Sequence, residues 1–181
     1  VTVMCAAILA AVAVPSFQST INNGRLATAS NELLASLQVA RMEAIRFNHR
    51  TIVCLSTNPT AANPSCAAAN ATNATGWITF VDTNRNGAYN SGTDKLMRVS
   101  TAPAKVRLLG SSNITNKVAV TFRADGFARN TTNDTYTGAF AVCMNTKRPE
   151  QNVRRVLVGV GGGISVERAG VGDGQCNEPG N

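Results

Sequence analysis

Residues 1–17 read VTVMCAAILAAVAVPSF, an almost wholly apolar run with a proline near its end. No charged residue precedes Arg25, and the first fourteen residues are apolar or nearly so. A bilayer-spanning helix needs roughly 20 residues, so the run alone could also form a buried core helix or the end of a signal peptide. It has neither an initiating methionine nor a basic flank, and its helical pattern continues beyond Pro15. We therefore expect the sequence to begin inside a longer hydrophobic helix.

The continuation of this helix is apolar along one stripe only. Apolar residues recur at three- and four-residue steps, the spacing of one face of an α-helix. They are Leu26, Ala29, Leu33, Leu37, Ala40, Ala44 and Phe47. A helix over residues 1–48 would be roughly 70 Å long, more than twice the thickness of the bilayer hydrocarbon. Its first part suits lipid or a helical bundle, its second part suits one face of a globular domain, and Pro15 should bend or loosen it locally.

After Arg50 the periodicity changes to two, which indicates β-strands. Clusters of Gly, Asn, Pro and Ser separate short β-rich runs. The runs are Thr51–Leu55, Trp77–Val81, Lys95–Val99, Val106–Leu109, Val118–Phe122, Ala139–Met144, Arg155–Val160 and Ile164–Val166. The chain of 181 residues is 44% hydrophobic and 15% charged, which is enough for one core of ordinary size. We predict an α+β fold in which antiparallel sheets pack on the amphipathic half of a long N-terminal helix.

Three segments carry a resemblance to a known family. VTVMCAAILAAVAVPSF resembles the tail of the signal segment of type IV pilins and type II secretion pseudopilins. The blocks ASNELLASLQVARMEAIRFNHRTIVCL (29–55) and GWITFVDTNRNGAYNSGTDKLMRV (76–99) resemble the GspH/FimT family of minor members. The resemblance implies a type IV pilin-like fold and a precursor that is cleaved, methylated and assembled into a filament. The family's cleavage site and near-terminal glutamate do not occur in the sequence, which we attribute to missing N-terminal residues.

The resemblance implies a structural, non-enzymatic role without cofactor, metal or small-molecule substrate. It predicts a membrane and filament-core helix at 1–21 and a periplasmic, later extracellular, globular domain at 22–181. We expect a single-pass inner-membrane protein of a bacterium that joins other minor and major pilins and helps to start assembly near the tip of a type IV pilus. The alternatives are a GspH-like type II secretion pseudopilin and a DNA-binding tip receptor for natural transformation. Residues expected to mark the membrane and filament helix are Val1, Ile8, Leu9, Val12, Val14, Pro15 and Phe17.

The five cysteines fit export to an oxidising compartment, which the resemblance implies. Family habit and nearness in sequence suggest pairing Cys54 with Cys66 and Cys143 with Cys176, although four cysteines allow three pairings. Each bond would contribute about 3 to 4 kcal/mol in the chain-entropy model. Cys5 would remain unpaired in the apolar helix. Zinc binding is disfavoured because no Cys-x-x-Cys spacing or paired histidine accompanies the cysteines.

The loop from Asp82 to Gly87 reads DTNRNG and invites comparison with a calcium loop. Thr93 stands at the twelfth position, where a bidentate glutamate is required, and Arg85 places a cation among the ligands. Asn and Asp also form such turns by bonding to nearby backbone, so we expect a turn without metal. The sequence contains no recognisable motif for a catalytic nucleophile, and the sole histidine, His49, follows the predicted helix. Gly161 to Gly163 should form a hairpin turn rather than a phosphate cradle.

Positive charge is concentrated in the middle of the β-rich region. Residues 98–168 hold eleven Lys/Arg and four Asp/Glu, and the whole chain has a net charge of +7. Such a surface attracts phosphate backbones. A basic face that is solvated or packed against acidic neighbouring subunits is the interpretation that we prefer, because a run of charges alone specifies no partner. Candidate DNA contacts are Arg123, Arg129, Lys147, Arg148, Arg154, Arg155 and Arg168. DNA-binding members of the resembled family use a Gly-Arg-x-Arg motif, whose arginines are absent from the corresponding RRVLVGVGGGISVER (154–168). Arg154 and Arg155 should point to opposite faces of their strand.

Overall fold

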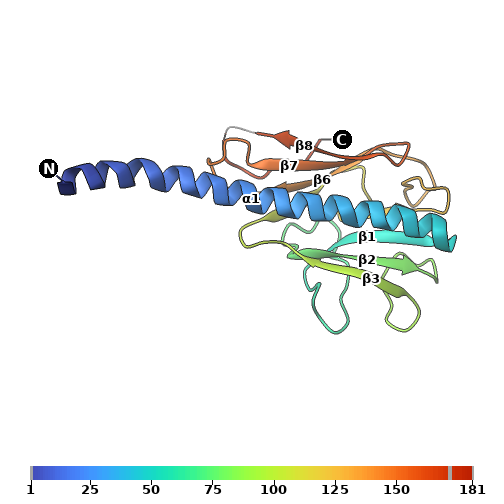
Figure 1. The fold of residues 1–181 in the computed structure, drawn as a ribbon. Helices are drawn as coiled ribbons and strands as arrows, with labels where there is room; N and C mark the ends of the chain where they lie inside the picture. The colour runs from blue at the N-terminus through green and yellow to red at the C-terminus, as the bar shows by residue number, and fades with distance from the viewer. Residues whose placement is uncertain (1, 171–172, 181) are drawn as a thin grey trace.

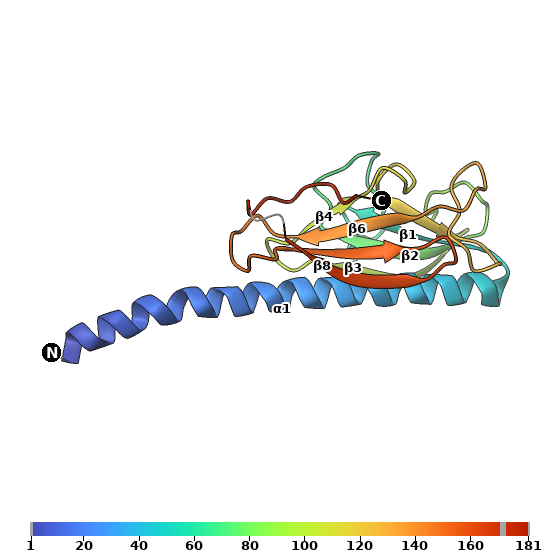
Figure 2. The ribbon, with the colours of Figure 1, turned by 90° about the horizontal axis from the view of Figure 1, so that it is seen from above.

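A single long helix precedes all the strands. The computed structural model describes residues 2–170 and 173–180, with side chains from residue 17 onward in those ranges. The helix, α1 (Thr2–Phe47), continues through Pro15 without a break. Its C-terminal half lies along the strands, and Figure 2 shows its N-terminal part projecting past them and curving away. The structure therefore confirms one long N-terminal helix, of which only the C-terminal half packs on the strands.

The buried stripe of α1 is the one that the periodicity predicts. Six of the seven predicted positions have 0% exposure. They are Leu26, Ala29, Leu33, Leu37, Ala40 and Ala44. The seventh, Phe47, is half-buried, and the ammonium of Lys95 lies 5.0 Å from its ring centroid. The helix is held to the domain by burial of this stripe, because packing rather than intrinsic propensity supplies most helix stability in proteins.

Eight strands occur in the described residues, one for each predicted run. They are β1 (Arg50–Ser56), β2 (Gly76–Asp82), β3 (Lys95–Thr101), β4 (Arg107–Gly110), β5 (Ala119–Phe122), β6 (Gly138–Cys143), β7 (Val153–Val158) and β8 (Ile164–Ala169). β8 ends at Ala169, three residues later than predicted, and β7 begins and ends two residues before the predicted 155–160. β7 ends early because of the turn that follows it, in which the Gly159 and Gly162 N–H groups donate to the carbonyls of Gly163 and Gly159. This confirms the predicted hairpin turn.

The strands form two four-stranded antiparallel sheets, with orders β3-β2-β1-β5 and β4-β6-β7-β8. In Figure 1 the two sheets lie on either side of the line of α1, and α1 contacts strands of both. The rings of Trp77, Phe80, Phe122 and Phe140 are fully buried in the core that these elements share. The predicted α+β architecture is confirmed.

Two disulfides tie loops to strands. Cys54 in β1 is bonded to Cys66, and Cys143 in β6 is bonded to Cys176 in the C-terminal segment. The second bond brings the C-terminal segment onto the outer face of the second sheet. A small apolar cluster forms there from Leu109, Ala141, Cys143 and Val153, with Ala169 and Cys176 packed against it. Both expected pairings are present.

Candidate functional site

The outward face of α1 carries exposed apolar side chains. Phe17 is 70% exposed and Met42 is 59% exposed, and Ile21 and Ile45 are also exposed. Of the residues expected to mark the membrane helix, Val1 lies outside the described residues. Five others belong to α1, but their side chains are not described: Ile8, Leu9, Val12, Val14 and Pro15. In the described part of the chain, no helix has a segment long and apolar enough to cross a bilayer.

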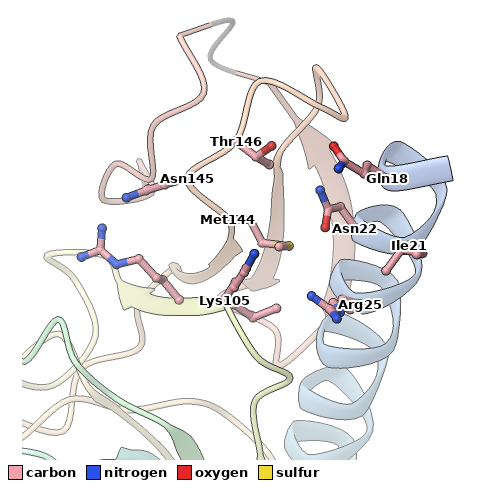
Figure 3. Close-up of a pocket in the computed structure, with 10 residues that line it drawn as sticks. Gln18, Ile21, Asn22, Arg25, Lys105, Met144, Asn145 and Thr146 are labelled. Atoms are coloured by element: carbon pink, nitrogen blue, oxygen red, sulfur yellow. The ribbon is translucent and has the colours of Figure 1, made fainter. Parts of the chain in front are cut away.

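A cavity of about 630 Å³ opens where α1 leaves the domain. We call it the helix-exit cavity. Three segments build it: two turns of α1, the start of β4 with the turn before it, and the residues that follow β6. Its lining is Gln18, Ile21, Asn22, Arg25, Lys105, Val106, Arg107, Met144, Asn145 and Thr146. Figure 3 shows Arg25 from the helix and Lys105 from the facing turn extending into the space between them.

The helix-exit cavity is cationic. It is lined by Arg25, Lys105 and Arg107, and its lining holds no Asp or Glu. Among residues 17–170 and 173–180, none of these three cations has a carboxylate partner. Lys105 has a φ of 69°, a left-handed conformation that is uncommon for a lysine. The cavity is therefore a region of positive potential that the described residues do not neutralise.

Hydrogen bonds fix the far wall of this cavity. Asn22 on α1 donates its side-chain amide to the carbonyl of Arg148 at 2.9 Å, and Thr146 Oγ1 donates to the same carbonyl at 3.0 Å. Asn145 Oδ1 accepts a hydrogen bond from the backbone N–H of Cys176 at 3.1 Å, and the Asn145 NH₂ group takes no part in this bond. The loop after β6 is thus attached both to the helix and to the disulfide-linked C-terminal segment.

Arg154, a candidate DNA contact, lies between the second sheet and α1. It is 4% exposed, and its guanidinium donates to Asn23 Oδ1 at 2.9 Å and to the carbonyls of Gln151 and Val153. Burial, and secondarily the charge of Arg168, lowers the pKa of the Arg154 guanidinium. The side chain is therefore not available to an external phosphate. Arg155 points to the other side, as expected, and pairs with Glu167 at 3.3 Å.

The remaining candidates lie at opposite ends of the domain. Lys147 and Arg148 are exposed in the loop bonded to Asn22, near the helix exit. Arg123 and Arg129 line a second cavity of about 400 Å³ beside residues 48–50, at the other end of the packed helix. Asn22 and Asn48 are roughly 40 Å apart along α1 at 1.5 Å per residue.

The second cavity, the distal cavity, is partly neutralised. The Arg129 guanidinium is 2.6 Å from the Asp125 carboxylate. Arg50, which also lines the cavity, pairs with buried Asp82 at 3.2 Å. Burial of Asp125 opposes its ionisation, but the Phe127 N–H and the Arg129 guanidinium outweigh that effect and lower the Asp125 pKa. The seven candidate residues, of which Arg168 is exposed on β8, do not form one continuous basic surface, and DNA binding gains no support.

The Asp82 loop is closed by its own backbone. The two Asp82 oxygens accept from the N–H groups of Asn86 and Gly87, at 3.1 Å each. The two Asp94 oxygens accept from Thr83 and Asn90 at 2.9 and 2.8 Å. Each carboxylate oxygen thus has a backbone donor, which is the arrangement of an Asx-rich turn. The described residues contain no group of three or more His, Cys, Asp or Glu side chains placed to hold a metal ion.

The helix-exit cavity could not be predicted from the sequence. Its cations come from positions 25, 105 and 107, which only the tertiary fold brings together. The one local signal was that Arg25 is the first charged residue after the apolar run. Lys105 and Arg107 belonged to the basic middle region but lay in no recognisable motif.

Comparison with known proteins places this fold. The profile of the family described as "Type II transport protein GspH" matches residues 29–162. The type IV minor pilin FimU of Pseudomonas aeruginosa is 22% identical, with a TM-score of 0.53 over 80% of this chain and 90% of FimU. The minor pseudopilin EpsH of the Vibrio cholerae type 2 secretion system is 11% identical, with a TM-score of 0.52 over 80% of this chain and 97% of EpsH. No curated protein sequence matches the chain.

Proposed function

The chain belongs to the GspH family of type II transport proteins, and from this membership we propose that it is a minor pilin that helps to start assembly near the tip of a type IV pilus. At the level of the family it is a minor pilin or pseudopilin, a structural and non-enzymatic subunit of a type IV pilus or a type II secretion system. The position near the tip and the choice of the pilus are the proposal.

The division of α1 into packed and projecting parts carries this proposal. The segment from Leu26 to Ala44 is fixed in the domain, whereas the helix extends back to Thr2 beyond the strands (Figure 2). Phe17 and Ile21 remain exposed on this projecting side. Before assembly the projecting helix would lie in the inner membrane, with the domain in the periplasm. In the filament it would pack on other pilins, where apolar burial contributes about 25 cal/mol per Å².

Two features agree with assignment to a pilus. Both predicted disulfides are formed, and cross-linked loops suit a subunit that is carried outside the cell. The chain is also strongly basic, with a net charge of +7, which suits contact with acidic neighbouring subunits. Its basic residues would then serve assembly rather than nucleic-acid binding.

Gene deletion with complementation tests the proposal. Loss of surface pili and twitching, restored by the wild-type gene, is the expected result. Phe17→Asp should restore few pili, because it places a charge on the exposed apolar face of α1. Gln38→Asp, which adds the same charge at an exposed polar position of the helix, should restore them. Normal piliation with defective protein secretion would instead assign the chain to a type II secretion system.

A further inference from the structure

We propose that the helix-exit cavity binds the headgroup of an anionic phospholipid while the subunit is still in the membrane. The inference rests on the proposed membrane-anchored function and adds a ligand to it. The observations that carry it are the position of the cavity along α1, its three cations without carboxylate partners in the described residues, and its mixed lining.

The cavity begins where the apolar part of α1 ends. Phe17 is the last residue of the apolar run and is exposed, and Gln18, the next residue, already lines the cavity. From Gln18 to Arg25 the helix rises roughly 10 Å at 1.5 Å per residue. The headgroup region on each side of the bilayer is roughly 5 to 8 Å thick. If the run up to Phe17 lies in hydrocarbon, the cavity lies at the level of the lipid phosphates.

The polar part of the lining suits a phosphodiester. Arg25, Lys105 and Arg107 supply positive charge, and the guanidinium of Arg25 can donate two parallel hydrogen bonds to phosphate oxygens. Gln18 adds a side-chain amide donor from the helix, and Asn145 lies on the opposite wall (Figure 3). The three cations repel the trimethylammonium group of phosphatidylcholine, so they favour phosphatidylglycerol, whose headgroup has no compensating cation.

The apolar part of the lining favours a lipid over a free anion as the ligand. Ile21 on the helix and Val106 and Met144 on the opposite side contribute apolar surface to the same cavity. Val106 and Met144 are themselves buried, so they are held in place by the core. This surface can contact the glycerol backbone and the first acyl methylenes, which inorganic phosphate lacks. Because hydrogen bonds fix the wall at Asn145 and Thr146, little ordering is needed on binding.

Native mass spectrometry of the full chain in detergent tests the proposal, with phosphatidylglycerol and phosphatidylcholine as separate probes. The site variant combines Arg25→Gln with Lys105→Asn, since asparagine tolerates the left-handed backbone at position 105. Arg46→Gln with Lys95→Gln is the control, because it removes the same charge at the far end of the packed helix. Lys105→Asn alone is a second variant, since Lys105 is exposed and the substitution should disturb the fold little. Fluorescence of the single tryptophan, Trp77, checks that each variant is folded.

We expect phosphatidylglycerol to bind more tightly than phosphatidylcholine, and the double site variant to weaken its binding about tenfold or more, the scale for two cations near a lipid surface. Lys105→Asn alone should weaken it severalfold, the control should bind as wild type does, and millimolar inorganic phosphate should not displace the lipid. Equal binding of both lipids, equal weakening by the control or displacement by phosphate would overturn the proposal. So would a site variant that binds lipid normally but no longer co-assembles with other pilins, which would assign the cavity to a neighbouring subunit.

Reconstitution separates failure of this site from failure of the proposed function. If the chain enters bilayer nanodiscs of either lipid but does not discriminate between them, the headgroup site is wrong and membrane anchoring stands. If it enters neither bilayer, the membrane-anchored function fails together with the site.

Discussion

Replacing Ser36 with alanine should destabilise the domain because it removes the acceptor of a buried indole N–H. Trp77 in β2 donates from Nε1 to Ser36 Oγ at 2.9 Å, and both residues have 0% exposure. Ser36 in turn donates its hydroxyl proton to the carbonyl of Glu32, one turn earlier in α1, at 2.9 Å. The hydroxyl therefore connects the helix to the first sheet at the centre of the core.

Two opposing effects set the size of the change. A buried donor without an acceptor costs about 1 to 3 kcal/mol. Alanine is a better helix former than serine by about 0.5 kcal/mol, which offsets part of that cost. We expect Ser36→Ala to lower the free energy of unfolding by about 1 to 2 kcal/mol. Ser30→Ala is the matched control, because Ser30 is also a buried serine on α1 but donates only to the carbonyl of Ala27. It should be neutral or slightly stabilising.

Urea unfolding followed by tryptophan emission provides the measurement, since Trp77 is the sole tryptophan of the chain. Ser36→Ala should lower the urea midpoint with an unchanged slope and should also alter the native emission spectrum, because the indole loses its hydrogen bond. Ser30→Ala should leave the spectrum unchanged. If the two variants shift the midpoint equally, the bond from Trp77 to Ser36 contributes nothing specific and the reasoning is wrong.

Three further predictions concern the turns and loops. Gly162→Ala should cost about 1 to 3 kcal/mol in urea unfolding, because φ is +71° and a Cβ would lie 2.4 Å from a backbone carbonyl oxygen; Gly161→Ala, with open space around it, should be close to neutral. Arg129→Gln should raise the pKa of Asp125 in a carboxyl NMR titration. The stabilisation due to Asp125 is present above its unfolded pKa of about 3.9 and is lost as pH falls through the lower folded value, and an unchanged titration would contradict this pairing. Cys66→Ser removes the disulfide to Cys54, 12 residues away in sequence, and should lower the free energy of unfolding by about 3 kcal/mol. Thermal melting checks this, and a melting curve like that of the wild type would show that the bond is dispensable.

Local patterns were sufficient to predict the elements of this fold. The stripe from Leu26 to Ala44 repeats at helical steps because one side of α1 faces the core, and each strand alternates or is bounded by turn residues. The order of the strands was beyond local reasoning. β5 joins β1 and β4 joins β6, and these pairings depend on which apolar faces can be buried together. The early end of β7 likewise depends on a turn in which the Gly162 carbonyl accepts a hydrogen bond from Arg41 on the helix, at 2.7 Å.

The roles of individual arginines could not be predicted from charge alone. Arg154 and Arg155 are adjacent and identical in type, yet one is buried against Asn23 and the other pairs with Glu167 at the surface. Alternation along the strand predicted that they differ, but which one faces the helix follows from sheet packing. The helix-exit cavity could not be predicted for the same reason, since Arg25 and Lys105 come to line one cavity only after the sheets have formed.

The packing of α1 along the sheets also determines how the subunit responds to force. A load applied to the projecting end of α1 acts along the helix axis, parallel to the buried stripe that begins at Leu26 and ends at Ala44. The interface is then loaded in shear, so its contacts resist together instead of separating one after another from the end. A lateral pull on the same helix would peel the stripe away sequentially. The domain should therefore withstand traction along α1 better than traction across it.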